Sequence, residues 1–166
     1  MSFIGMFAKQ RETKQIKKEI ETKDLKIEII PINNKSIENV KNVKYDIIII
    51  IDELEDLKDK EKYITNTLKN SKYLILNSDI KFDIGIIKDV NIRTITYGLN
   101  QKATITASSI GESDMIVCIQ RAFKDINNNT IEQKEVRRKI EKSDIKNIYN
   151  TLIKEAIINI YSAKNR

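Results

Sequence analysis

Acidic side chains gather directly after the most apolar stretch of the sequence. Residues 45–51 read YDIIIII, and four acids follow them: Asp52, Glu53, Glu55 and Asp56. Carboxylates in this number could hold a Mg²⁺ ion, which prefers oxygen ligands. Acids also suit the first turn of a helix, where the dipole stabilises each by roughly 0.3–1 kcal/mol. We favour the helix start, and therefore expect no bound metal.

Two residue types on which much enzyme chemistry depends are scarce. The chain has no His, which removes the commonest general base and the commonest zinc ligand. Cys118 is the single cysteine, so neither an internal disulfide nor a structural zinc site can form. Because Cys118 lies in the apolar run of residues 115–119, we interpret it as a buried structural thiol rather than a nucleophile. The sequence therefore offers no catalytic residue.

Basic residues exceed acidic ones, with a formal net charge of +6 and a pI of about 9.2. Such a charge can attract nucleic acid or an anionic surface. Most lysines are nevertheless scattered among acids, and one region alone approaches a basic patch: Lys134, Arg137, Arg138, Lys139, Lys142 and Lys146. We expect a solvated surface there rather than a nucleic-acid site.

Apolar runs are short. The longest, residues 47–51, falls well below the roughly 20 residues that a membrane-spanning helix needs. The first residues, MSFIGMFAKQR, lack the pattern of a secretory signal. We expect a cytoplasmic protein without membrane insertion.

Strand and helix patterns alternate through the first half of the chain. The expected strands are residues 3–7, 25–30, 45–51, 73–76, 85–87 and 93–97, and the expected helices are residues 9–22, 36–42 and 52–70. Pro31 should end the second strand, and Ser36 should cap the helix that follows it. This alternation predicts an α/β fold with a mostly parallel, Rossmann-like sheet flanked by helices. We expect residues 1–166 to form a single domain.

The pattern changes in the stretch of residues 93–110, RTITYGLNQKATITASSI. Its two Thr- and Ile-rich arms suit strands, and Gly98 and Asn100 suit the turn between them. The second arm, residues 103–108, and two further strands, residues 115–123 and 130–140, have no room for helices between them and should pair as antiparallel hairpins. An amphipathic helix over residues 144–163 closes the chain, capped by Ser143 or Asp144. Its expected apolar face consists of Ile145, Ile148, Tyr149, Leu152, Ile153, Ala156, Ile157, Ile160 and Tyr161.

Three segments together resemble the central, ATP-binding domain of the Mur ligases, which join amino acids to peptidoglycan precursors. Residues 73–79 (YLILNSD) are similar to the family's strand ending in Asn-x-Asp-Asp. Residues 96–110 (TYGLNQKATITASSI) resemble its Tyr-Gly-x-Asn strand-turn-strand. Residues 143–161 (SDIKNIYNTLIKEAIINIY) are similar to its Gly-x-His-Asn-x-x-Asn helix start and the helix that follows. The segments occur in the family's order and cover about residues 45–161.

The phosphate-binding loop of that family is missing. The family holds ATP phosphates on a Gly-rich loop that ends in Lys and Thr. None of the chain's four glycines fits that loop, although Gly5 stands where it would begin. Lys9, Arg11 and Lys14 could still attract an anion to the helix that follows.

Further positions depart from the family's pattern. Leu57 stands where the family has a His, and Thr67 stands at the position of the Lys that is carbamylated to support magnesium. Lys146 replaces another His, and Ile80 replaces the last Asp of Asn-x-Asp-Asp. The chain also leaves no room after its last helix for the family's C-terminal domain. The resemblance therefore implies a truncated, degenerate relative without ligase activity.

The positions that do match imply where a nucleotide would lie. Asn77 and Asp79 match the Asn-x-Asp-Asp segment, and Asn147 and Asn150 match the asparagines of the last one. The resemblance makes these four the candidate nucleotide-binding residues. For Asn147 and Asn150, helix capping is the alternative interpretation.

Two functions stay open at this point. The first is a catalytically inactive, bacterial Mur-ligase-like domain that acts as an interaction or regulatory module, linked by family analogy to the cell envelope or sporulation. It would need no cofactor, and exposed strand edges predict a protein partner or self-association. The second is a nucleotide-binding protein or enzyme that uses a degenerate site at the carboxyl ends of the strands.

Overall fold

A computed structural model describes residues 1–21 and 25–162 of the chain. Thr22 and Ala163, the last residues of two predicted helices, lie outside the described residues. The chain forms two compact units, Met1–Thr94 and Ile95–Arg166, whose boundary falls within strand β5 (Arg93–Tyr97). The expectation of one domain over residues 1–166 stays a prediction.

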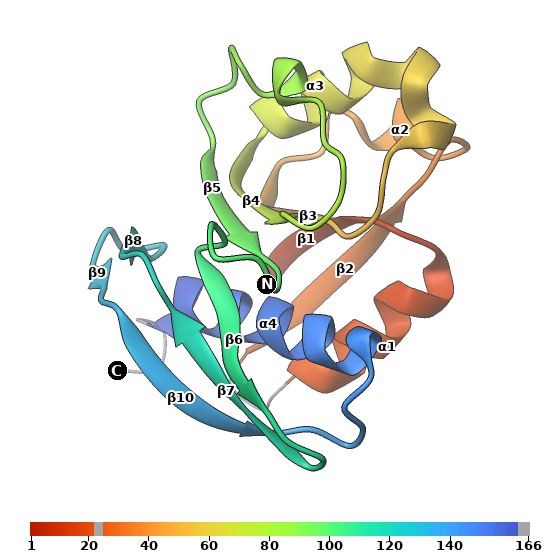
Figure 1. The fold of residues 1–166 in the computed structure, drawn as a ribbon. Coiled ribbons are helices and arrows are strands. Elements are labelled where there is room, and N and C mark those ends of the chain that lie inside the picture. The colour runs from red at the N-terminus through yellow and green to blue at the C-terminus, as the bar shows by residue number, and fades with distance from the viewer. Residues whose placement is uncertain (22–24, 163–166) are drawn as a thin grey trace. The chain divides into compact units, whose positions relative to one another are not determined.

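The first unit is a parallel α/β layer, as the alternating pattern predicts (Figure 1). Its strands lie in the order β4-β3-β1-β2, and all three neighbouring pairs are parallel. Its elements are β1 (Ser2–Phe7), α1 (Gln10–Ile20), β2 (Ile27–Ile32), α2 (Ile37–Val40), β3 (Tyr45–Ile50), the 3₁₀ helix η1 (Glu55–Lys60), α3 (Glu61–Lys69), β4 (Ser71–Asn77) and the 3₁₀ helix η2 (Ile84–Ile86).

Strand β3 is the buried centre of this unit. Residues 47–50 are all isoleucine and fully buried, because α2 and α3 pack over one face of the strands while α1 lies on the other (Figure 1). A strand covered on both faces reads as a continuous apolar run, which confirms the prediction for residues 45–51. The core under α2 and α3 includes Phe7, Ile37 and Leu68.

Two predictions in this unit are wrong in detail. Strand β2 does not end at Pro31 but continues to Ile32, with Pro31 opposite Met6 of β1. Among the described residues β2 pairs with β1 alone. At such an edge position the strand tolerates a proline, because the N–H that proline lacks is not needed for pairing on the open side. Ser36 stands at the N-cap position of α2 as predicted, but its side chain makes no cap bond; its hydroxyl instead accepts the N–H of Asn33 at 3.0 Å.

Local structure also differs around the expected helix of residues 52–70 and the expected strand of residues 85–87. The helix begins only at Glu55, as 3₁₀ turns, and becomes α-helical from Glu61. Residues 85–87 lie in and after η2, where the carboxylate of Asp83 accepts the N–H of Gly85 at 2.8 Å. Three apolar residues without strand neighbours do not hold an extended conformation by themselves.

The second unit combines antiparallel strands with one long helix (Figure 1). β6 pairs antiparallel with β7, and β7 with β10, as predicted. β5 and β6, the arms of the stretch 93–110, instead pair in parallel, with Tyr97 opposite Ile105, so they do not form the expected tight turn. The elements after β5 are β6 (Ile105–Ile110), β7 (Asp114–Ile119), β8 (Phe123–Lys124), β9 (Thr130–Ile131), β10 (Lys134–Lys139) and α4 (Ile145–Ile160).

Helix α4 begins at the predicted cap. The carboxylate of Asp144 accepts the N–H of Asn147 at 2.9 Å, and this bond lowers the pKa of Asp144. Most of the predicted apolar face is buried, but Ile145, the first residue of the helix, is 51% exposed. Polar Glu155 is 2% exposed, which the apolar spacing does not predict.

Candidate functional site

The strand order of the first unit creates a switch point between β1 and β3. From β1 the chain moves outward to β2, and it then crosses to β3 on the other side of β1. Open α/β sheets bind ligands at the carboxyl ends of the strands beside such a point. A crevice of about 610 Å³ lies there, formed by the last residues of β1 and β2, by residues that follow β1, β2 and β3, and by Glu12 of α1.

The start of α1 forms one wall of this crevice. The N–H of Lys9 donates to the carboxylate of Glu12 at 2.9 Å, so a side chain of the helix itself occupies a donor at the helix start. Of the three cations expected to attract an anion, Lys9 lines the crevice, whereas Arg11 and Lys14 do not. The anion site predicted at this helix is therefore occupied in part by an acid.

Gly5 does not begin a loop, contrary to the sequence-based placement. It lies inside β1, with Ile30 of β2 and Ile48 of β3 on either side. A Cβ at this position would lie 2.6 Å from Cδ1 of Ile48 and 2.8 Å from Cδ1 of Ile32. The absence of a side chain serves packing between strands here, and the link between β1 and α1 contains no glycine.

The expected acidic group divides between two cavities. Asp52, Glu53 and Asp56 line the crevice, whereas Glu55 lines a neighbouring cavity described below, which shares Glu53, Leu54 and Leu57 with the crevice. Burial raises the pKa of Asp52, and the nearby carboxylate of Glu12 raises it further. Within residues 1–21 and 25–162, no three acidic or sulfur side chains are grouped as a metal ion would require.

Asn77 and Asp79 lie at the end of β4, next to each other. The side-chain N–H of Asn77 donates to the carbonyl of Ile51 at 3.1 Å, and its Oδ1 accepts the N–H of Asp79 at 2.9 Å. Asn77 is 2% exposed, so its amide ties the ends of β3 and β4 together. Neither residue lines the crevice.

Asn147 and Asn150 lie in the second unit, on the first turns of α4. The side chain of Asn147 donates to both carboxylate oxygens of Asp144, at 3.0 and 2.9 Å. Asn150 is 8% exposed, and its Nδ2 has no hydrogen-bond partner among the described residues. The local bonds of Asn147 are those of a helix cap, which was the alternative interpretation.

Half of the basic patch makes contacts within the second unit. Arg138 donates to Glu155 with Nε at 2.7 Å and Nη2 at 3.1 Å, which raises the pKa of the guanidinium. Arg137 pairs with Asp114 at 3.3 Å, and Lys134 donates to Asn159 at 2.9 Å. These bonds engage three of the six cations of the patch with partners in the second unit.

Cys118 is half-buried on β7, not buried as predicted. Burial and the nearby carboxylate of Glu135 both raise the pKa of the thiol. A raised pKa reduces the thiolate fraction, so the thiol is less reactive than a free cysteine.

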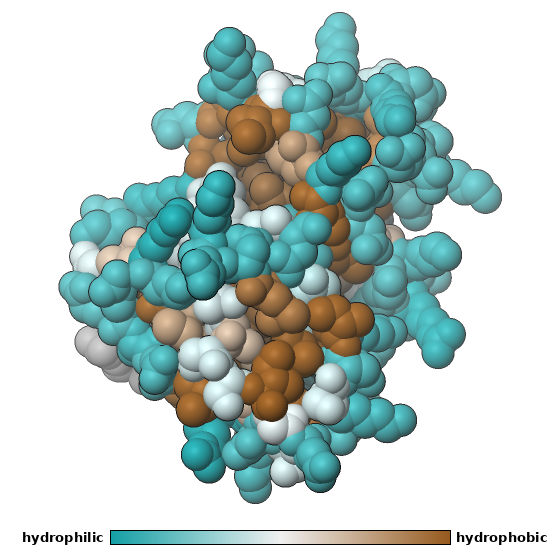
Figure 2. Space-filling view, in the orientation of Figure 1, coloured by the Kyte–Doolittle hydropathy of each residue, from teal (hydrophilic) through white to brown (hydrophobic). Residues whose placement is uncertain are grey.

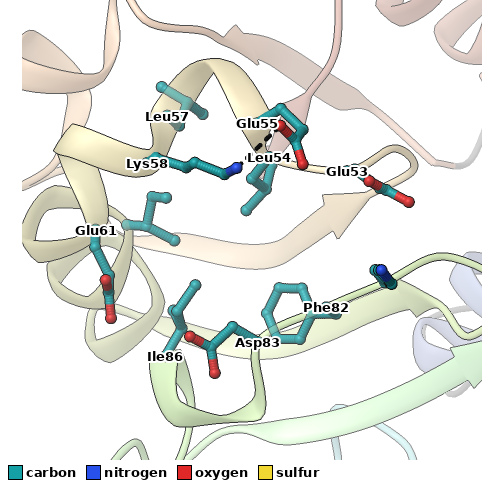
Figure 3. A pocket seen from close by; sticks show the side chains of 11 residues that line it. Glu53, Leu54, Glu55, Leu57, Lys58, Glu61, Phe82, Asp83 and Ile86 are labelled. Carbon is teal, nitrogen blue, oxygen red and sulfur yellow. Dashed lines mark ion pairs between the residues drawn. The ribbon is translucent and has the colours of Figure 1, made fainter.

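A second cavity in the first unit, here termed the apolar pocket, was not predicted from the sequence. It measures about 410 Å³ and lies between η1, the start of α3 and the segment after β4 (Figure 3). Ile86 lines it from residues 85–87, which the sequence pattern wrongly predicts as a strand, and Phe82 lines it from just before them. The apolar residues of KFDIGII are the signal that could have identified it, because they have no strand partner to cover them.

Comparisons with known proteins do not assign a family: no protein-family model and no curated protein matches this chain. The resemblance to the Mur ligases is therefore carried by the three sequence segments alone. None of the helices in the described ranges is both long enough and apolar enough to cross a membrane.

Proposed function

We propose that this protein is a catalytically inactive, Mur-ligase-like domain of bacterial origin that acts in the cytoplasm as an interaction or regulatory module. A link to the cell envelope or to sporulation follows from the family resemblance alone. The observation that carries the loss of catalysis is the start of α1, where the Glu12 carboxylate accepts the Lys9 N–H.

A phosphate-binding helix start keeps its backbone N–H groups free for the ligand and surrounds it with positive charge. Here Gly5 is committed to strand packing, and Glu12 places a negative charge at the helix start. Losing one preorganised electrostatic contact typically costs about 10²–10³ in rate. A site that lacks the loop and carries an acid in its place does not support acyl-phosphate chemistry.

The charge of the crevice also supports the absence of ATP binding. Two ammonium groups, from Lys9 and Lys35, face four carboxylates: Glu12, Asp52, Glu53 and Asp56. A triphosphate would enter this negative environment against repulsion. The crevice therefore disfavours ATP even before the missing loop is considered.

Calorimetric titration with ATP·Mg and with ADP tests this proposal. We expect binding no tighter than about millimolar, together with no hydrolysis of ATP. The double variant Asp52→Asn/Glu53→Gln removes two of the repelling charges and should strengthen any residual binding, whereas Glu112→Gln/Glu141→Gln in the second unit should not. Micromolar affinity of the unmodified protein for either nucleotide would contradict the proposal.

Nucleotide binding in a degenerate site is the second candidate, and the crevice at the switch point is the observation that favours it. About 610 Å³ is within the size range of small-molecule pockets. A crystal soaked with nucleotide separates the candidates, because density against Lys9 and Lys35 would support this one.

A further inference from the structure

Hydrophobic side chains of the first unit line the apolar pocket. Leu57 and Ile64 are almost fully buried, at 5% and 1% exposed, so the accessible apolar surface comes from Leu54, Phe82 and Ile86, which are only partly buried. Figure 3 shows the side chains of η1 and those of the segment after β4 facing each other across this space. A cavity of about 410 Å³ can hold one large apolar side chain or a ligand of similar size.

The rim of the pocket is predominantly acidic. Four carboxylates, Glu53, Glu55, Glu61 and Asp83, stand against two ammonium groups, Lys58 and Lys81. Lys58 pairs with Glu55 at 3.0 Å, which removes one charge of each sign from the balance. A cationic ligand is therefore favoured and a carboxylate ligand is opposed.

The apolar surface continues beyond the cavity. Ile84, next to Asp83, is 73% exposed and does not line the pocket. Figure 2 shows apolar side chains among hydrophilic ones around the segment that connects β4 with β5. A free amine inside the cavity would leave Ile84 in water, whereas a polypeptide crossing the rim would cover it.

We propose that the apolar pocket receives a large apolar side chain of a partner protein, and that lysine or arginine residues flank this side chain in the partner. The inference rests on the proposed interaction role and names the chemistry of the partner. The partly buried apolar side chains of the pocket supply the contact area, and the carboxylates of Glu53, Glu61 and Asp83 select the flanking cations.

An NMR titration with short capped peptides tests this pocket. The probe carries leucine between two lysines; one matched peptide replaces the leucine with serine, and another replaces both lysines with glutamate. We expect the methyl resonances of Leu54, Ile64 and Ile86 to shift with the first peptide at about 10 mM and not with the two matched peptides.

Variants of the rim give the second arm of the test. The double variant Glu53→Gln/Glu61→Gln should weaken binding of the lysine–leucine–lysine peptide about fivefold. Raising the salt concentration to about 0.5 M should also weaken binding. The matched control, Glu112→Gln/Glu141→Gln, alters the net charge equally in the second unit and should leave binding unchanged. All four residues are exposed, so neither variant disturbs the core.

Several results would overturn the inference. The inference is wrong if the lysine–leucine–lysine peptide causes no methyl shifts. It is also wrong if the peptide with two glutamates causes equal shifts. Shifts with n-butylamine but not with the peptide would assign the pocket to a small amine instead. Failure here leaves the nucleotide titration unaffected, whereas micromolar ATP binding in the crevice would overturn the proposed function while the peptide result stands.

Discussion

The two units bury different kinds of side chain. The first unit encloses a core of aliphatic residues, with Ile47 to Ile50 fully buried on both faces of β3. The second unit also buries a carboxylate, since Glu155 on α4 is 2% exposed, whereas buried amides occur in both units, as Asn77 and Asn159 show. Apolar burial needs only area and shape, whereas a buried carboxylate needs partners in fixed positions. Substitutions should therefore damage the two units through different physical causes.

The largest effect is expected from Arg138→Ala, which leaves the carboxylate of Glu155 buried without its bidentate partner. We expect a loss of about 3 kcal/mol in the free energy of unfolding, below the full cost of a broken buried pair because Arg138 is partly exposed. Chemical denaturation measures the loss, and hydrogen exchange should show it in the amides of α4. Arg137→Ala is the control one residue away, since its exposed pair with Asp114 should contribute less than about 1 kcal/mol. Equal losses for the two arginines would contradict the importance of the Glu155 contact.

The matching test of the apolar unit is Gly5→Ala. The added methyl group would meet Cδ1 of Ile48 at 2.6 Å, so the side chains around β1 must shift. Overpacking of this kind costs about 2 kcal/mol. Gly85→Ala is the control, because its nearest contact is the exposed side chain of Asp83 at 3.0 Å. Thermal unfolding that is unchanged in Gly5→Ala would show that the core accommodates the methyl group.

The smallest effect is expected at the crevice, from Asp52→Asn. Because the folded-state pKa of Asp52 is raised above its ordinary value, the folded protein binds a proton more readily than the unfolded chain does. The stabilisation that the folded state gains from this proton is fully present at pH below the ordinary pKa of Asp52, and it is lost as pH rises through the folded-state pKa. Asp52→Asn should therefore stabilise the protein at pH 7, by on the order of a few tenths of a kcal/mol because the side chain is exposed, and should give no gain near pH 3. If thermal unfolding showed a larger gain in stability from Asp52→Asn at pH 3 than at pH 7, the upward direction assigned to the pKa shift of Asp52 would be wrong.

The difference between the units also explains what the sequence could predict. Residues 45–51 and the spacing of Ile148, Leu152 and Ile157 report burial directly, so the parallel strands and α4 are correctly predicted. Glu155 lies on the same helix, but its burial depends on Arg138, which is 17 positions away in the chain. Side-chain partners at that separation leave no local pattern.

The candidate sites divide in the same manner. The position of the crevice follows from strand order, which the sequence predicts in outline. Its occupancy by Glu12 depends on one hydrogen bond at the start of α1. The apolar pocket was missed because Phe82 and Ile86 lie in a segment whose irregular path between β4 and β5 has no periodic signal.

The position of Gly5 has a consequence for protein engineering. An attempt to rebuild triphosphate recognition here gains nothing from the glycine already present, because that residue is locked between two neighbouring strands. A grafted loop would have to be inserted between Phe7 and Gln10, and Glu12 would have to be neutralised at the same time.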